Sequence, residues 1–367
     1  PIREILRSAV YQLKFMDRVP DSAVCNEAVK LAQKKGFYNL KPFVNGVLRT
    51  VARQMDELEY PPREENLVRY LSVRYSMPEE LVERWLNDYG EETTEKMLAD
   101  FLEEKPVTVR CRTYLNSVDK ICESLKNQGV KVEQAPYLPY AKRISGYNHI
   151  LALDAFIQGK ILVQDVSSML VAEIANPSRG DYVIDMCAAP GGKTCTIAAG
   201  MEQTGCVHAF DLAEHRVKLI QDNVKRLGLR NVQAAQGDAT RFQEAYAGAD
   251  CVLCDVPCSG IGVLRHKPEV KEKSPEALAE LPALQLAILE NGARYVKAGG
   301  ILQYSTCTIL KEENEGVAEA FLQAHPEFEP VPVYPALGGV LEQPMATILP
   351  EMFGSDGFFV AKFRKKG

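Results

Sequence analysis

The feature that most constrains the fold is a regular alternation of strand-like and helix-like segments over residues 164–367. Short apolar runs are separated by longer segments with helical periodicity, such as Glu214–Leu227 and Pro275–Tyr295. This order is typical of an α/β domain with a doubly wound parallel sheet. The predicted strands are Tyr182–Asp185, Cys206–Phe210, Val232–Gln236, Cys251–Cys254 and Ile301–Ser305, with a late strand, Phe358–Phe363, expected antiparallel at the sheet edge.

Two helical segments precede this sheet. Residues 1–60 predict an all-α segment of two or three helices, because apolar residues follow helical spacing and Pro20 and Gly36 interrupt the pattern. Residues 61–104 predict a helical connector. The chain starts at Pro1, without an initiator Met and inside a helix-like pattern, so we expect further residues before it.

Residues 105–163 predict a small α+β domain, ferredoxin-like or RRM-like. Val107–Cys111 alternates apolar and polar residues, Ser117–Asn127 predicts a helix, and Val130–Val132 and Ile150–Leu153 predict further strands. Basic and aromatic residues of this domain would suit a nucleic-acid surface, namely Arg110, Arg112, Lys142, Arg143, Tyr137, Tyr140 and Tyr147.

Composition excludes several classes of protein. A chain of 367 residues has room for two or three domains. It contains no run of 18 apolar residues and no targeting segment, so we expect no membrane span and a cytoplasmic protein. The ten scattered cysteines are expected to remain thiols. Cys251 and Cys254 are expected as buried strand residues, and no metal site is expected.

The charge distribution says more than the formal net charge of −6. Residues 1–56 carry 10 Lys and Arg against 5 Asp and Glu, and residues 105–150 carry 8 against 3. The intervening residues 57–104 carry 5 against 14. Two basic segments separated by an acidic one suit a polyanion that lies over selected surfaces, although solvated helix faces give the same pattern.

The first predicted strand leads into a loop of small residues. The segment Asp185–Thr194 contains Gly191 and Gly192 and precedes a helix, so backbone and a helix N-terminus can approach a ligand there. A phosphate-binding P-loop needs Gly at position 187, where the chain has Cys187, and the G-x-G-x-x-G fingerprint is also absent.

Four carboxylates follow four successive predicted strands: Asp185, Asp211, Asp238 and Asp255. Because ligands of open α/β sheets bind at the carboxyl ends of the strands, we expect all four to face that crevice. Any one of these Asp residues could instead be the N-cap of the helix that follows its strand. A nucleoside without phosphates fits best, and S-adenosylmethionine is expected with its ribose on Asp211, its adenine near Asp238 and its methionine end along Cys187–Lys193.

Two cysteines stand in short motifs at the ends of predicted strands. Cys258 follows Asp255 and a rigid Pro257, and Cys307 lies within Tyr304–Thr308. C5 of cytosine attacks a methyl donor only after a thiolate adds to C6. Either thiol could attack while the other helps to undo the adduct, with Asp255 at the pyrimidine edge. Each cysteine alone could be a loop or strand-end residue without a catalytic role.

These motifs resemble the RNA (cytosine-5) methyltransferases of the RsmB/NOL/NOP2/Sun family. The segments that carry the resemblance are Asp185–Thr194, Asp211, Gly237–Asp238, Asp255–Gly260 and Tyr304–Cys307. In addition, Leu13–Gln54 looks like the second half of the NusB-like domain that precedes the methyltransferase in bacterial small-subunit rRNA members. The resemblance covers nearly the whole chain.

The resemblance implies a Rossmann-like class I methyltransferase fold in residues 164–367. Ahead of it lie a ferredoxin- or RRM-like RNA-binding domain in residues 105–163, the helical connector in residues 61–104, and a NusB-like segment in residues 1–60. The expected partner is RNA, most specifically 16S rRNA, and no obligate protein partner is evident.

The resemblance also implies roles for individual residues. Cys307 is expected as the nucleophile on C6 and Cys258 as the thiol that assists release, whereas DNA cytosine-5 methyltransferases attack with their Pro-Cys thiol. We take Asp255 and Lys193 as further catalytic residues. The residues expected to bind S-adenosylmethionine are Cys187, Ala188, Ala189, Pro190, Gly191, Gly192, Lys193, Asp211, Asp238 and Asp255.

Two other functions remain to be weighed against 16S rRNA methylation. One is a tRNA-directed methyltransferase of the same family, which the NusB-like segment disfavours. The other is an RNA-binding scaffold for ribosome assembly with vestigial catalysis. The presence of both cysteines and of all four strand-end carboxylates argues against a scaffold.

Overall fold

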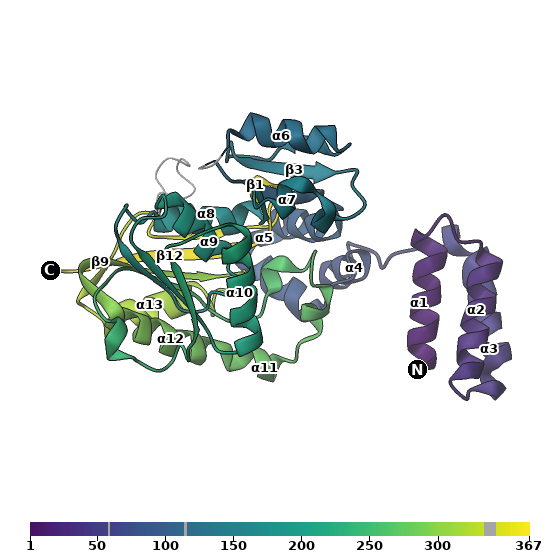
Figure 1. Cartoon of the computed structure of the whole chain (residues 1–367). Coiled ribbons are helices and arrows are strands. Elements are labelled where there is room, and N and C mark those ends of the chain that lie inside the picture. Colours follow the sequence, from purple (N-terminus) through teal and green to yellow (C-terminus); the bar gives the residue numbers. More distant parts are fainter. Residues whose placement is uncertain (58, 114–115, 334–342) are drawn as a thin grey trace. The chain divides into compact units, whose positions relative to one another are not determined.

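The computed structural model describes residues 1–57, 59–113, 116–333 and 343–367. The chain divides into two compact units, a helical unit over Pro1–Ser76 and a larger unit over Met77–Gly367 (Figure 1). No helix within these residues is both long enough and apolar enough to cross a bilayer.

The helical unit contains α1 (Ile2–Phe15), α2 (Asp21–Lys34), α3 (Lys41–Arg53) and α4 (Leu67–Arg74), as the periodicity predicts. Single-turn helices Tyr38–Leu40 and Met55–Glu57 follow α2 and α3. A core of small and branched side chains joins the first three helices, namely Ile5, Ala9, Val24, Cys25, Ala28, Ala32, Val44 and Leu48.

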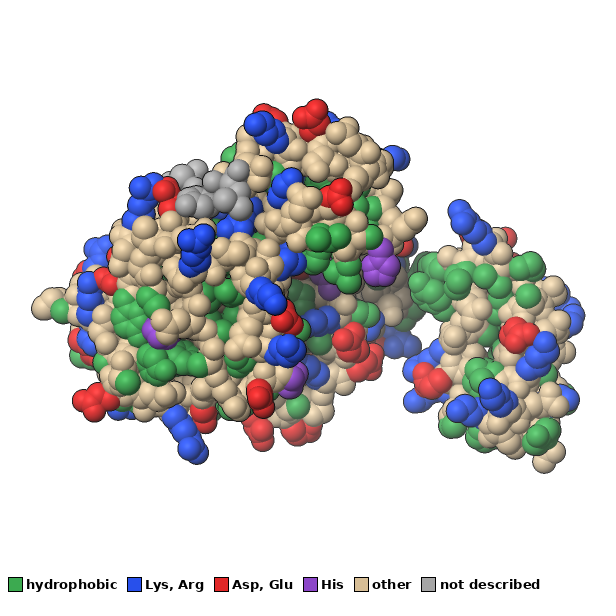
Figure 2. Space-filling view, viewed as in Figure 1, with side chains coloured by type: hydrophobic (Ala, Val, Ile, Leu, Met, Phe, Trp, Pro, Cys, Tyr) green, Lys and Arg blue, Asp and Glu red, His purple; other side chains and the backbone are tan. Residues whose placement is uncertain are grey.

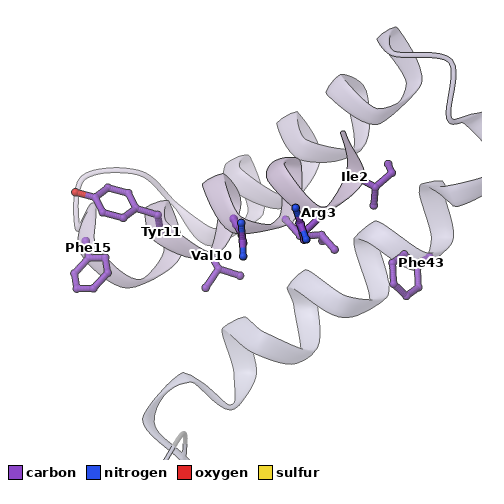
Figure 3. Close-up of a pocket in the computed structure, with 8 residues that line it drawn as sticks. Ile2, Arg3, Val10, Tyr11, Phe15 and Phe43 are labelled. Carbon is purple, nitrogen blue, oxygen red and sulfur yellow. The ribbon is translucent and has the colours of Figure 1, made fainter. Parts of the chain in front are cut away.

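The helical unit also exposes large apolar side chains, which reach its surface among Lys and Arg side chains (Figure 2). Several of them line a groove of about 600 Å³ between α1 and α3. Figure 3 shows Val10, Tyr11 and Phe15 of α1 and Phe43 of α3 along it. Its lining is almost entirely apolar, with Arg3 and Arg7 as the charged members.

The larger unit begins with α5 (Glu79–Leu102), which is interrupted at Gly90 (φ 78°, ψ 172°). A four-stranded antiparallel sheet of order β2-β3-β1-β4 follows. Its elements are β1 (Val107–Cys111), α6 (Val118–Asn127), β2 (Lys131–Gln134), β3 (Ala141–Ser145), α7 (Asp154–Ile157) and β4 (Ile161–Val163). The predicted small α+β domain is therefore present.

The strand predicted at Ile150–Leu153 is wrong. Residues Ile150–Ala152 form a 3₁₀ turn, in which the amides of Ala152 and Leu153 bond to carbonyls three residues earlier. A run of four apolar residues does not distinguish a strand from a helical turn. The fourth strand is β4 instead, and the basic strand β3 was not predicted because its Lys142 and Arg143 interrupt the apolar pattern.

The second sheet has the strand order β10-β12-β9-β8-β5-β6-β7. Strands β5 to β9 are mutually parallel, and β12 is antiparallel to β9. The strands are β5 (Tyr182–Asp185), β6 (Cys206–Asp211), β7 (Val232–Gln236), β8 (Ala249–Asp255), β9 (Val296–Thr306), β10 (Phe328–Pro330), β11 (Met345–Ile348) and β12 (Phe358–Lys365).

Helices cover both faces of this sheet. Figure 1 shows α8 (Val166–Ala175) and α9 (Gly192–Gly200) on one face, and α12 (Leu281–Tyr295) and α13 (Glu315–Ala324) on the other. The helix α10 (Glu214–Arg226) packs on β6 and β7. Because both faces are covered, side chains of β8 are buried on either side of the sheet. Cys251 and Cys254 are both buried, as predicted, but in separate cores.

Two details of the predicted sheet need correction. The strand β12 is antiparallel, as predicted, but it does not form the edge, because β10 and β11 both pair with its outer side. The predicted helix Pro275–Tyr295 is two helices, α11 (Pro275–Ala279) and α12. Pro282 lies in the first turn of α12, where its missing amide is tolerated, and disfavours a continuous helix through it.

Candidate active site

A cavity of about 570 Å³ opens at the carboxyl ends of the parallel strands. The loops after β5, β6, β7, β8 and β9 all contribute to its wall, because a parallel sheet brings these strand ends to one edge. The chemically active side chains that line it are Cys187, Asp211, Asp238, Asp255, Cys258 and Cys307. The cavity has two halves, which we call the donor half, around Asp211 and Asp238, and the thiol half, around Cys258 and Cys307.

The loop after β5 forms the floor of the donor half. Gly191 (φ 98°) is the N-cap of α9; its left-handed backbone conformation favours Gly, and a Cβ there would lie within a tight 3.3 Å of the Ile220 backbone of α10. The amide of Ala189 donates a hydrogen bond to Asp211 Oδ2 over 3.1 Å. These contacts fix the turn against the end of β6.

Asp211 is almost fully buried, and its two carboxylate oxygens have different surroundings. Within the described residues its Oδ1 accepts no hydrogen bond, although Arg216 Nη1 lies 3.3 Å away as an ion-pair partner. Arg216 is itself about half exposed, so a ligand can reach this carboxylate. A carboxylate oxygen in this position is a suitable acceptor for a ribose hydroxyl.

Asp238 has a more open environment. Its Oδ1 accepts hydrogen bonds from the Thr240 amide (2.9 Å) and hydroxyl (2.7 Å), which lower the pKa of Asp238 below its ordinary value. Arg241 lies 3.3 Å from its other oxygen. The carboxylate therefore stays ionised at neutral pH at the mouth of the cavity.

The prediction that Asp185 also faces the crevice is wrong. Its side chain is 1% exposed, does not line the cavity, and accepts a hydrogen bond from Thr194 Oγ1 over 2.6 Å. Burial raises the pKa of Asp185 to about 7. Asp185 therefore ties the end of β5 to α9, and three strand-end carboxylates line the cavity instead of four.

The two cysteines of the thiol half face each other. Cys258 Sγ and Cys307 Sγ are 3.2 Å apart, and both side chains are half-buried in the cavity wall. The Cys258 loop packs closely on the Cys307 backbone through Gly262, whose amide bonds to the Cys307 carbonyl and where a Cβ would lie 2.9 Å from that carbonyl oxygen.

The environments of the two thiols differ in electrostatics. A hydrogen bond from the Cys258 thiol lowers the pKa of Cys307 below its ordinary value, against the effect of burial, and the Lys193 ammonium acts in the same direction. The same hydrogen bond, together with burial and the Glu313 carboxylate, raises the pKa of Cys258 well above its ordinary value. The pair is therefore set to hold a thiolate on Cys307 and a thiol on Cys258.

Asp255 and Lys193 form an ion pair beside the thiols. Lys193 Nζ lies 2.8 Å from Asp255 Oδ2, and Ser305 Oγ donates to Asp255 Oδ1 over 2.8 Å. Although burial disfavours the ammonium, the adjacent Asp255 carboxylate raises the pKa of Lys193 above its ordinary value. The Lys193 side chain is 12% exposed and lies over the Phe358 ring.

Some of the predicted site residues line the cavity, and the others lie behind its wall. Cys187, Ala189, Asp211, Asp238, Asp255, Cys258 and Cys307 line the cavity. Ala188, Pro190, Gly191, Gly192 and Lys193 do not line it, and instead form the turn and helix start behind its wall. Burial raises the pKa of Cys187 well above its ordinary value, which makes a nucleophilic role for this thiol unfavourable.

Sequence reasoning missed several residues of the cavity wall. These are Leu212, Arg216, Val263, Lys267, Val270, Lys273, Leu284 and Ile288. The apolar members carry no local signal, because they reach the cavity only through the folding of the 256–273 loop and the placement of α12. Lys267 and Lys273 lie in that same loop after Cys258, where a run of basic residues was the available signal.

The predicted basic and aromatic surface of the small domain is wrong for two of its arginines. Arg110 and Arg112 are 8% and 4% exposed; the first packs over the Tyr140 ring and the second donates to the Leu227 carbonyl. Arg143 donates to the Gly354 carbonyl over 2.8 Å. Arg112 and Arg143 thus join the small domain to the catalytic domain, and Arg110 packs within the small domain, so Arg110 and Arg112 do not form an open surface.

Comparison with known families covers most of the chain. Residues 172–364 match the family described as 16S rRNA methyltransferase RsmB/F. Residues 77–150 match the ferredoxin-like domain of RsmF/B-like methyltransferases, and residues 1–53 match the NusB family.

Curated relatives align over nearly the whole of this chain. The probable ribosomal RNA small subunit methyltransferase B of Bacillus subtilis is 38% identical over 99% of this chain and 83% of the relative. The corresponding protein of Synechocystis is 35% identical over 99% and 83%. The ribosomal RNA small subunit methyltransferase B of Klebsiella pneumoniae is 34% identical over 99% and 81%.

Solved structures share the fold. The crystal structure of PH0851 superposes with a TM-score of 0.85 at 30% identity, over 99% of this chain and 82% of that chain. NSun6 from Pyrococcus horikoshii, solved with SFG, has a TM-score of 0.71 at 24% identity over 79% and 98%, a likeness of fold alone. With these matches to all three parts of the chain, the protein belongs to the RsmB/F family of 16S rRNA methyltransferases.

Proposed function

We propose that this protein transfers a methyl group from S-adenosylmethionine to C5 of a cytosine in 16S rRNA, through a transient covalent bond to Cys307. The observation that carries the proposal is the pair of thiols 3.2 Å apart in a cavity that three strand-end carboxylates share. The names of the relatives support the class of RNA.

The residues of the donor half fit the methyl donor. None of the described residues donates a hydrogen bond to the buried Asp211 Oδ1, which suits a ribose hydroxyl, and the more exposed Asp238 would accept a hydrogen bond from the adenine amino group. The loop Cys187–Lys193 would hold the methionine end. When bound, S-adenosylmethionine supplies an electrophilic methyl group on a sulfonium centre.

In the first step the Cys307 thiolate adds to C6 of the cytosine. The S–C6 bond forms, the C5=C6 pair moves to C4=C5, and the C4=N3 pair moves to N3. The Asp255 carboxylate accepts a hydrogen bond from the exocyclic amino group, and the Lys193 ammonium, which is ion-paired with Asp255 behind the cavity wall, stabilises the negative charge at N3 through its electric field. C5 then becomes the nucleophile that takes the methyl group, and N3 regains its double bond.

In the last step the adduct is resolved by elimination. The C5 proton passes to water, its electron pair re-forms the C5=C6 bond, and the S–C6 bond breaks with its pair on Cys307. The Cys258 thiol donates its hydrogen bond to the departing sulfur, which stabilises the leaving thiolate. The close approach of the two sulfur atoms supports this division of roles.

RNA recognition is proposed for residues 105–163, with the catalytic domain in 164–367, the connector in 61–104 and the NusB-like segment in 1–60 as an additional RNA-directed part. An rRNA substrate would place the enzyme in the cytoplasm. Tyr137 is 56% exposed and is a suitable stacking residue of the small domain.

The test compares two alanine variants on an RNA fragment of 16S rRNA with S-adenosylmethionine present. Cys307→Ala is expected to lose methylation by at least ~10³-fold, because no thiolate can add to C6. Cys258→Ala is expected to accumulate a covalent protein–RNA adduct, seen as a slow band under denaturing conditions. An adduct with Cys307→Ala would reverse the two roles.

The target RNA is tested by mapping 5-methylcytidine in cells with and without the gene. Loss of the modification in 16S rRNA is expected. Loss in tRNA would favour the tRNA-directed alternative, and an unchanged map together with full function of Cys307→Ala in ribosome assembly would favour a scaffold.

A further inference from the structure

A buried carboxylate lies behind the thiol half of the cavity. Glu313 is 1% exposed, does not line the cavity and stands in the turn between β9 and α13. Among the described residues, none donates a hydrogen bond to its Oε1, and none forms an ion pair with it. Burial of an unpaired carboxylate is costly, so its retention needs a physical explanation.

Glu313 holds the loop that carries Cys258. Its Oε2 accepts hydrogen bonds from the Ser259 amide (2.9 Å) and from Gln285 Nε2 (2.7 Å). Gln285, which is fully buried on α12, also donates to the Pro257 carbonyl over 3.0 Å. Glu313 and Gln285 therefore fix the residues on both sides of Cys258.

Asn314, the next residue, holds the residues on both sides of Cys307. Asn314 Oδ1 accepts a hydrogen bond from Thr306 Oγ1 over 2.6 Å, and Asn314 Nδ2 donates to the Thr308 carbonyl over 3.1 Å. Thr306 and Thr308 flank Cys307, and all three polar residues are fully buried. One turn thus carries two side chains that each hold the neighbours of one catalytic cysteine.

The side chains of Glu313 and Asn314 differ in charge. An amide at position 313 could accept from Ser259 and would cost less to bury than a carboxylate. A negative charge behind Cys258 disfavours ionisation of that thiol, which agrees with the raised pKa of Cys258. The thiol then keeps the proton that it needs in order to donate to the departing Cys307 sulfur.

We propose that Glu313 is a positioning residue for the release half of the reaction. Through Ser259 and Gln285 it holds Cys258 opposite Cys307, and its charge prevents a second thiolate beside the first. Asn314 is the corresponding positioning residue for the addition half. This inference rests on the proposed covalent mechanism and extends it to residues outside the cavity.

The test uses the full chain with Glu313→Gln, and Asn314→Ala as a matched control from the same turn. In single-turnover reactions on the RNA fragment, Glu313→Gln is expected to form the adduct at a rate within about twofold of the parent and to release product about tenfold more slowly. The adduct band should therefore accumulate. Asn314→Ala is expected to slow adduct formation without accumulation.

A second readout follows thiol reactivity in the absence of RNA. In a Cys307→Ser background, Glu313→Gln is expected to increase the alkylation rate of Cys258 by iodoacetamide at pH 8, because the opposing charge is gone. An unchanged rate would contradict the electrostatic part of the inference, whatever the thermal stability of the variant.

The outcomes separate the inference from the proposed function. If Cys258→Ala traps the adduct but Glu313→Gln releases product as fast as the parent, the inference is wrong and the covalent mechanism stands. Equal slowing of formation and release by Glu313→Gln would show a general structural role and would also overturn it. If no variant traps an adduct and Cys307→Ala is active, the proposed function itself fails.

Discussion

The two halves of the cavity are built differently. In the thiol half, the residues next to Cys258 and Cys307 are held by hydrogen bonds from the fully buried side chains of Gln285 and Asn314. In the donor half, Asp238 is about one-third exposed, and its contacts with Thr240 and Arg241 lie within its own turn. The sheet positions both halves, but hydrogen bonds from buried side chains hold the thiol half more firmly.

The difference follows from what each half must do. A thiolate has to meet C6 at bonding distance, and a misplacement of about 1 Å can cost ~10²-fold in rate. A donor with many polar atoms can instead complete its own contacts on binding, so part of its site tolerates exposure. Mutations in the thiol half should therefore act on rate, and those in the donor half on affinity.

The largest effect after loss of Cys307 is expected for Asp255→Asn. The amide leaves Lys193 without its counter-charge at a 12% exposed position and disturbs the group that faces the pyrimidine. We expect single-turnover methylation to fall by at least ~10²-fold. Affinity for S-adenosylmethionine, measured by calorimetry, should change by less than about threefold, since the contact belongs to the thiol half.

Ser305→Ala provides the control for Asp255→Asn. It removes one hydrogen bond to the same carboxylate but keeps its charge, so a loss below about tenfold is expected. A large loss of donor affinity with Asp255→Asn, at unchanged rate under saturation, would assign Asp255 to the donor half instead.

A pH titration of alkylation tests the asymmetry within the thiol half. Because the pKa of Cys307 is lowered and that of Cys258 is raised, Cys307 carries a larger fraction of thiolate than Cys258 at a given pH. Iodoacetamide should therefore modify Cys307 at least about tenfold faster than Cys258 at pH 7, as measured by peptide mass spectrometry. Equal rates would remove the electrostatic basis for two separate roles.

The smallest effects on the methylation rate are expected in the donor half. Asp211→Asn replaces a buried charged acceptor and should weaken S-adenosylmethionine binding by about 10- to 100-fold, corresponding to one hydrogen bond to a charged group. The more exposed Asp238→Asn should weaken it by less than about tenfold. Both should keep the methylation rate near the parent value at saturating donor. A fall in the saturated rate would break the proposed division between the halves.

The sheet was predictable to a large extent, and the exceptions have local causes. All five parallel strands were placed because short runs rich in apolar residues alternate with helical segments, and an Asp or Gly stands at or just after the end of four of them. The strand β3 was missed since its basic residues interrupt that pattern, and the 3₁₀ turn Ile150–Ala152 was misread because four apolar residues carry no period.

For the candidate site, sequence position alone identified the strand ends but not the direction of each side chain. Asp185 occupies the same kind of position as Asp211, yet it is buried against Thr194 and does not reach the cavity. Arg110 and Arg112 are basic residues of the kind that RNA-binding surfaces contain, yet they are buried in contacts with Tyr140 and Leu227. Burial depends on neighbours that are distant in sequence.

What the sequence determined by itself is the order of the parallel strands and the residue types at their ends, because both follow from local periodicity and from the short loops that join the elements. Only the tertiary structure decided that Cys258 and Cys307, 49 positions apart, face each other across 3.2 Å, and that Glu313 and Asn314 stand behind them. The physical reason is that a parallel sheet gathers strand ends from the whole chain at one edge, and the packing of α12 and α13 then sets which polar groups are buried there.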